Sequence, residues 1–214
     1  GINISDTSGP QISPRMGQLL SAGVARVEIL RGPQGLLYGA DAGGVINIST
    51  SKDTAELAGS VSMESGSHST NQKTASISGG NGLIDFFLSG VKMQTKGFNS
   101  RTSDNILEDD DGYKNETLHT KIGLTPTDGL RLDFIFHDVD AKNEYDICYT
   151  ASFSVSNDCD DTFSQEAWRV SANYQFENFN HEISYNNSKT DRVFFTEDVP
   201  GFSPLGELKQ YGYL

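Results

Sequence analysis

The sequence predicts a mainly β fold, in which antiparallel strands form part of a transmembrane barrel wall. Three observations support this. Apolar and polar side chains alternate along seven segments after about Ala58. The links between these segments alternate between short and long, and several segments exceed the roughly 9–11 residues that a tilted strand needs to cross a bilayer.

The alternation is clearest in residues 130–137, where even positions are apolar and Arg131, Asp133 and His137 occupy the odd positions. One face of such a strand is apolar and the other is polar. The same pattern covers residues 118–124, 168–176 and 179–186, with weaker versions over residues 58–66, 72–80 and 83–95. The sequence therefore predicts seven strands.

The links favour a barrel over a soluble sandwich, which also alternates. Tight turns are expected at Gly80–Gly82, Pro126–Gly129 and Glu177-Asn178. Long polar connections are expected over residues 96–115 and 142–163 and in the tail from Thr196. Outer-membrane barrels have short turns at one rim and long loops at the other, whereas structureless links of about twenty residues are unusual in compact soluble domains.

Composition excludes two classes of protein. The net charge of -13, without a basic cluster, argues against nucleic-acid binding. The mean hydropathy of -0.43, without a window of roughly 18 apolar residues, excludes a helical membrane protein but not a barrel. Because the chain begins at Gly1 without an initiator Met or a signal peptide, we expect a processed or truncated start.

The first fifty residues do not alternate. They contain a helical candidate around Pro14–Ala22, a glycine-punctuated segment over residues 24–44 and a short strand at Val45–Ser49. Glycines at such intervals require tight backbone turns at defined places. No phosphate-binding motif opens a helix here, so the residues give no support to nucleotide binding.

Residues 24–48 closely resemble the end of the plug domain of the TonB-dependent outer-membrane receptors. The motif comprises Arg31-Gly32-Pro33, Tyr38-Gly39, Gly43-Gly44 and Ile46-Asn47-Ile48, although residues 40–44 are one residue shorter than usual. The opening Asp6–Pro10 is weakly similar to plugs of the cobalamin-receptor subgroup. The resemblance implies that residues 1–53 are the C-terminal part of an α+β plug, and that residues 54–214 supply about seven of 22 barrel strands. The chain is then a fragment of a larger protein.

The function implied by this resemblance is active uptake of a scarce nutrient, such as a metal chelate or cobalamin, across the bacterial outer membrane. The implied partners are the TonB energy-transducing protein, outer-membrane lipid and the small nutrient. In the family, the arginine that corresponds to Arg31 pairs with acidic residues of the wall, so the motif would latch the plug. The alternative for Arg31 is a solvated turn charge. For the whole chain, the alternatives are a passive porin or adhesin-type barrel, or a soluble β-sandwich binding module.

Two further features lie in the long links. Cys148 and Cys159 are expected to form a disulfide that would be worth roughly 3 kcal/mol, with two free thiols as the alternative. Carboxylates also concentrate in these links. Flexible loops rich in oxygen ligands can bind Ca²⁺, and the alternative is that these acidic loops are simply solvated. The candidate calcium ligands are Asp109, Asp111, Asp158 and Asp160. No other cofactor is expected, and no arrangement of catalytic groups is recognisable, so we do not expect an enzyme.

Overall fold

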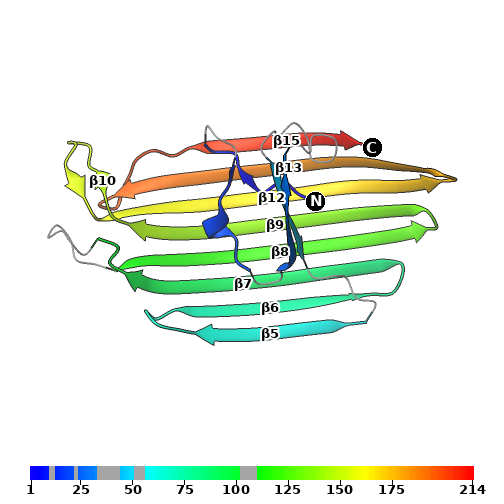
Figure 1. The fold of residues 1–214 in the computed structure, drawn as a ribbon, viewed down its shortest axis with the longest axis horizontal. Helices are drawn as coiled ribbons and strands as arrows, with labels where there is room; N and C mark the ends of the chain where they lie inside the picture. The colour runs from blue at the N-terminus through cyan, green and yellow to red at the C-terminus, as the bar shows by residue number, and fades with distance from the viewer. Residues whose placement is uncertain (10–12, 22–23, 33–43, 51–55, 102–109) are drawn as a thin grey trace.

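Strands dominate the computed structural model, which describes residues 1–9, 13–21, 24–32, 44–50, 56–101 and 110–214. The largest unit is an antiparallel sheet of nine strands, hereafter the wall (Figure 1). Its order is β14-β13-β12-β9-β8-β7-β6-β5, with β15 also beside β13. The strands are β5 (Ala58–Ser65), β6 (Asn71–Gly80), β7 (Ile84–Phe98), β8 (Asp111–Thr127), β9 (Leu130–Tyr145), β12 (Cys159–Phe176), β13 (Phe179–Thr196), β14 (Val199–Pro200) and β15 (Leu205–Tyr213).

The two rims of the wall differ as the sequence predicts. The tight turns after β6, β8 and β12 lie at one end of the strands, and the longer links after β7 and β9 lie at the other (Figure 1). The link after β9 carries a small hairpin, β10 (Cys148–Tyr149) with β11 (Val155–Ser156). The predicted fold class, a partial antiparallel barrel wall, is confirmed.

Two wall strands, the two-residue β14 and the longer β15, were not predicted. β15 pairs with β13 from Asp191↔Leu205 to Ile183↔Tyr213, so the expected long polar tail from Thr196 is wrong. Gly206 and Gly212 replace side chains on its inward face, and Glu207 and Lys209 stand on its outward face. Glycine and outward charges therefore hide the alternation that identified the other strands.

The N-terminal segment, residues 1–50, forms two small antiparallel sheets. β1 (Ser5–Asp6) pairs with β2 (Ser13–Pro14), and β3 (Val24–Arg31) pairs with β4 (Gly44–Thr50). The predicted helix over residues 14–22 is replaced by one turn of 3₁₀-helix, η1 (Met16–Gln18). No α-helix occurs among the described residues, so the expected α contribution to this segment is not found there.

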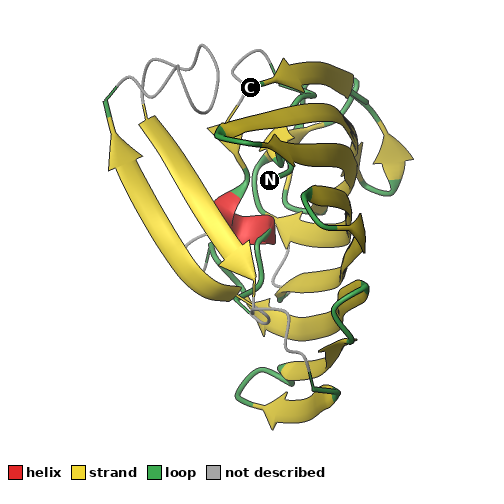
Figure 2. Cartoon of the chain, turned by 90° about the vertical axis from the view of Figure 1, so that its right-hand side faces the viewer, coloured by secondary structure: helices red, strands yellow, loops and turns green. Residues whose placement is uncertain are grey.

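The wall is curved, and the N-terminal segment lies on its concave side. Figure 2 shows η1 between the wall and the β3–β4 hairpin. Inward side chains of the middle strands are buried beneath this segment, including Asn115, Val139 and Ala167. Outward apolar side chains such as Phe134, Val170 and Ile183 remain exposed. The concave face is thus the packed one, and the oily face points away from the protein. No helix in the described part of the chain has the length and hydropathy to span a membrane.

Candidate functional site: the junction of the N-terminal segment and the wall

A cluster of four charged side chains joins the β1–β2 hairpin to the wall. Asp6 is only 2% exposed and accepts a hydrogen bond from Arg15 Nε at 2.7 Å. Arg192 of β13 lies with Nη1 3.9 Å from Asp6 and donates from Nη2 to Asp161 of β12 at 2.8 Å. Arg192 and Asp161 are each 8% exposed. The Arg15 side chain is 45% exposed, so the buried part of the cluster is Asp6, Asp161 and Arg192. The two arginines and two carboxylates balance in charge, which offsets the cost of burying the three inner groups.

Asp6 is held in its ionised form. Burial alone would raise the pKa of this carboxyl, but hydrogen bonds from Ser8 and Arg15 outweigh it, and the pKa falls below its usual value. Ser8 donates to Oδ1 from both its amide, at 2.9 Å, and its hydroxyl, at 2.5 Å. Asp6 therefore organises its own hairpin as well as facing Arg192.

Neutral contacts extend this junction along the wall. Gln165 Nε2 donates to the Ser5 carbonyl at 3.2 Å and to Thr190 Oγ1 at 3.0 Å. A Cβ built on Gly206 of β15 would lie 1.9 Å from the Thr7 carbonyl oxygen. Only glycine allows the hairpin backbone to approach β15 so closely.

The short helix docks further along the same face. Tyr113 Oη lies 2.9 Å from the Gly17 carbonyl oxygen and 2.8 Å from Gln18 Oε1. Its single hydroxyl proton can be donated to either oxygen. Asn115, which is fully buried, donates to the Gln18 carbonyl at 3.1 Å. These bonds satisfy the carbonyls of η1 in place of water.

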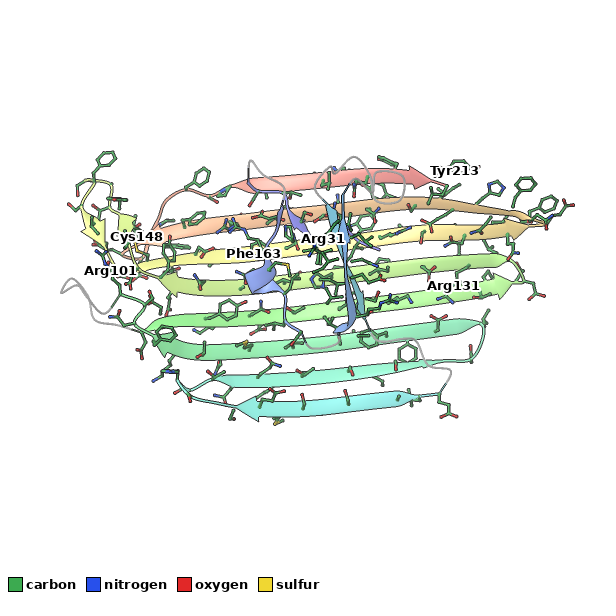
Figure 3. The ribbon with its side chains drawn as sticks, viewed as in Figure 1. Arg31, Arg101, Arg131, Cys148, Phe163 and Tyr213 are labelled. Carbon is green, nitrogen blue, oxygen red and sulfur yellow. A yellow bond between two sulfur atoms is a disulfide. The ribbon has the colours of Figure 1, made fainter. Side chains whose placement is uncertain are left out.

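Another inward arginine links three wall strands. Arg131 of β9 reaches across β8 to pair with Asp85 of β7, and it also donates to Asp133 at 3.0 Å (Figure 3). The strand between them carries Gly123, where a Cβ would lie 1.9 Å from the Arg131 guanidinium. The missing side chain opens the path by which Arg131 crosses to Asp85.

The plug motif falls only partly within the described residues. Gly32 and Gly44 have φ values of +87° and +130°, which explains glycine at both positions. Arg31 is exposed at the end of β3, and no ion pair joins it to the wall among the residues described (Figure 3). Its wall partners stay a prediction. The remaining motif residues, Pro33, Tyr38, Gly39 and Gly43, lie outside the described residues.

The two cysteines are joined. Cys148 and Cys159 form a disulfide with a Cα–Cα distance of 6.0 Å, at the base of the β10–β11 hairpin. Neither thiol is free, so the alternative of two reduced cysteines does not describe this structure.

Asp111, Asp158 and Asp160, the candidate calcium ligands among the described residues, do not form a metal-binding group there. Burial raises the pKa of Asp158 first, and the neighbouring charges of Asp198, Asp160 and Glu197 raise it further. Within the described ranges, however, no three His, Cys, Asp or Glu side chains are grouped closely enough to hold a metal ion. Asp111 is described at the start of β8, and Asp109 lies outside the described residues. Calcium binding stays a prediction.

Comparisons with known proteins identify the family. No family model matches the chain. It is 32% identical over 146 residues to the vitamin B12 transporter BtuB of Photobacterium profundum, covering 67% of this chain and 24% of that protein. It is also 32% identical over 137 residues to the iron-regulated outer membrane virulence protein of Vibrio cholerae, covering 60% of this chain and 20% of that protein. The chain belongs to the TonB-dependent outer-membrane receptors.

Solved structures agree with this assignment at the level of the fold. The siderophore receptor PirA from Acinetobacter baumannii superposes with a TM-score of 0.71 at 17% identity, covering 99% of this receptor chain and 34% of that structure. The copper transporter OprC superposes with a TM-score of 0.70 at 14% identity, covering 100% of this chain and 33% of that structure. The receptor chain thus spans about a fifth to a third of the length of the relatives named here.

The family assignment identifies the wall. The wall is a stretch of outer-membrane barrel, and the soluble β-sandwich alternative is excluded. The sequence did not predict the contact of Asp6 with Arg192 or the ion pair of Arg131 with Asp85, because in both pairs the two residues lie far apart in the sequence. One usable signal was present: arginines and aspartates occupy inward positions of long strands, where a filled barrel must neutralise them.

Proposed function

We propose that the full receptor takes up a scarce nutrient, a metal chelate or cobalamin, across the outer membrane, with TonB supplying the energy. The observation that carries this proposal is the N-terminal segment on the concave face of the wall. It buries Asp6, Asn115 and Arg192 in specific contacts. A passive porin has no need of a folded segment fixed by buried ion pairs inside its channel.

The relatives support a class of transported nutrient but do not identify which nutrient of that class this receptor carries. Three of those named above are a vitamin B12 transporter, a siderophore receptor and a copper transporter, and the fourth is an iron-regulated outer membrane protein. The cargo in the first three names is a metal ion or a small molecule that contains or binds one. We propose the same class here. The relatives are receptors and transporters, and we propose no catalytic step for this chain.

Uptake in living cells tests the proposal. The full-length gene is expressed in a strain that lacks its own receptors, and accumulation of labelled cobalamin and of ferric siderophores is measured with and without functional TonB. The expected result is saturable uptake of one of these nutrients that disappears without TonB. Uptake that continues without TonB would favour the passive porin, and no uptake of any metal-containing nutrient would refute the proposed cargo class.

A further inference from the structure

The outward face of the wall changes abruptly from apolar to charged at one level. Strand register aligns the outward residues of β8, β9, β12 and β13 into rows that run across the wall. Two successive rows near the tight turns are almost wholly apolar: Leu124, Leu132, Ala172 and Ile183, then Ile122, Phe134, Val170 and Tyr185. The next row, Thr120, Phe136, Trp168 and Asn187, is the last with large apolar side chains on β9 and β12.

Beyond that level the rows carry charge. They are Leu118, Asp138, Glu166 and Lys189, then Glu116, Asp140, Ser164 and Asp191, then Lys114, Lys142, Thr162 and Val193. A lipid-facing charge is costly at the bilayer midplane but not near the interface. The change therefore marks where the hydrocarbon ends on the side of the long links, which in outer-membrane barrels is the extracellular side.

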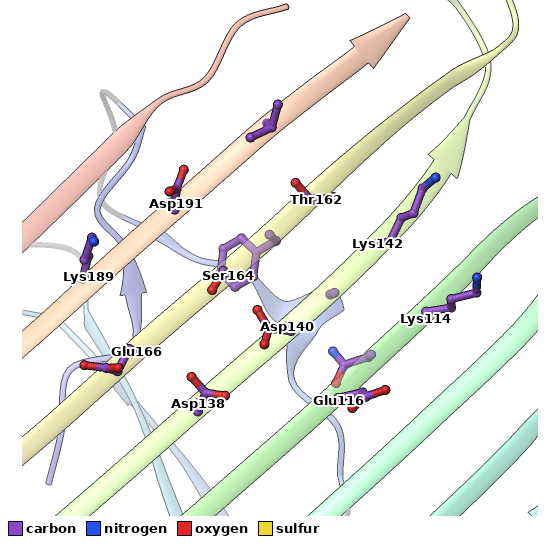
Figure 4. Close-up of a pocket in the computed structure, with 14 residues that line it drawn as sticks. Lys114, Glu116, Asp138, Asp140, Lys142, Thr162, Ser164, Glu166, Lys189 and Asp191 are labelled. Carbon is purple, nitrogen blue, oxygen red and sulfur yellow. The ribbon is translucent and has the colours of Figure 1, made fainter. Parts of the chain in front are cut away.

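These charged rows line an open groove of about 640 Å³ on the outward face (Figure 4). Few of the charges neutralise one another. Lys142 pairs with Asp160 at 3.3 Å, and Lys92 pairs with Glu116, but Lys114 and Lys189 form no ion pair among the described residues. The groove thus offers lysines free to bind an anion, beside carboxylates that suit a cation.

We infer that this groove binds the phosphate-bearing headgroups of outer-leaflet lipid, with divalent cations between the lipid phosphates and the carboxylates. The lysines donate to phosphate oxygens, for which an ammonium is well suited. Asp138, Asp140 and Glu166 share with the phosphates the hard oxygen ligands that divalent cations prefer. The location of the groove identifies lipid headgroups as the ligand, because the groove begins where the apolar, lipid-facing rows end.

Binding of purified lipopolysaccharide to the full-length receptor in detergent tests the inference. The variant Lys114→Gln/Lys189→Gln removes two unpaired lysines from the groove. At about 1 kcal/mol for each basic residue near an anionic lipid surface, it should bind lipopolysaccharide about 30-fold more weakly. The matched control Lys121→Gln/Arg26→Gln removes the same charge from the inward side of β8 and from the N-terminal segment, and should bind as the wild type does.

Two further measurements identify the ligand chemistry. Chelation of divalent cations should weaken binding to the wild type, and Asp138→Asn/Asp140→Asn should lose most of this sensitivity. Inorganic phosphate should not displace the lipid. Equal lipid binding by the lysine variant and its control would overturn the inference, as would full displacement by inorganic phosphate. The inference rests on the outer-membrane position and not on the cargo, so uptake assayed on the same variants tests the proposed function separately.

Discussion

Replacement of Arg192 by methionine tests whether the buried ion cluster holds the N-terminal segment to the wall. Methionine keeps much of the length and removes the charge. Asp6 and Asp161 would then face each other across the junction without Arg192, while Arg15 still reaches Asp6. Removing one partner from a buried ion pair costs about 3–5 kcal/mol, because the other charge is left unpaired.

Hydrogen exchange of the β1–β2 hairpin in the full receptor is the suitable measurement, since exchange reports local opening. A loss of about 3–5 kcal/mol corresponds to exchange about 10²- to 10⁴-fold faster. The control Arg26→Met removes an arginine whose side chain is 70% exposed and which pairs with Glu28 within β3. An exposed pair contributes at most about 1 kcal/mol, so the control should change exchange by no more than about fivefold.

The double variant Arg192→Met/Asp161→Leu separates the ion pair from general packing. It removes the stranded carboxylate of Asp161, so exchange should recover part of the way toward the wild-type rate. If Arg192→Met exchanges no faster than Arg26→Met, the cluster does not fix the segment, and the argument from burial is refuted.

Three other outcomes follow from contacts described above. Gly123→Val should displace Arg131 and destabilise the wall by about 1–3 kcal/mol in thermal unfolding, whereas Gly90→Val, where a Cβ meets nothing within 4 Å, should have little effect. Cys159→Ser should speed proteolysis of the β10–β11 link by releasing a constraint of about 3 kcal/mol, and an unchanged cleavage rate would contradict this. The pKa of Asp6 is lowered from its ordinary value of 3.8, so the ionised carboxylate stabilises the fold at neutral pH, and this contribution is lost as the pH falls below that value. Amide hydrogens of the β1–β2 hairpin should therefore exchange faster in Asp6→Asn than in the wild type at pH 7, and at the same rate at low pH.

The wall was predictable from the sequence because its strands obey a simple physical rule. A strand between lipid and a packed interior must alternate, and β9 does so clearly over residues 130–134. The rule fails where the outward face leaves the hydrocarbon. Beyond Phe136 the alternation changes phase, because Asp138 and Asp140 face outward while Val139 and Ala141 are buried on the inward face. The apolar pattern that identified the lipid-facing segment therefore stops there, and the sequence underestimated how far β9 and β12 continue.

The N-terminal segment was less predictable because its conformation depends on the wall. The residues around Met16 allow a helix, yet hydrogen bonds to Tyr113 and Asn115 favour a single 3₁₀ turn. The partners Asp6 and Arg192 are separated by nearly the whole chain. Their pairing follows from the curvature of the sheet, which one sequence does not encode in any local pattern.

The disulfide bears on how the receptor is assembled. Cys148 and Cys159 are only 11 residues apart, so their bond can close as soon as the chain reaches an oxidising compartment, before β9 and β12 have paired. The link after β9 would then cross the membrane during barrel insertion as a closed ring instead of an open strand. Without that bond, the same link would have to cross as an open loop with a longer reach.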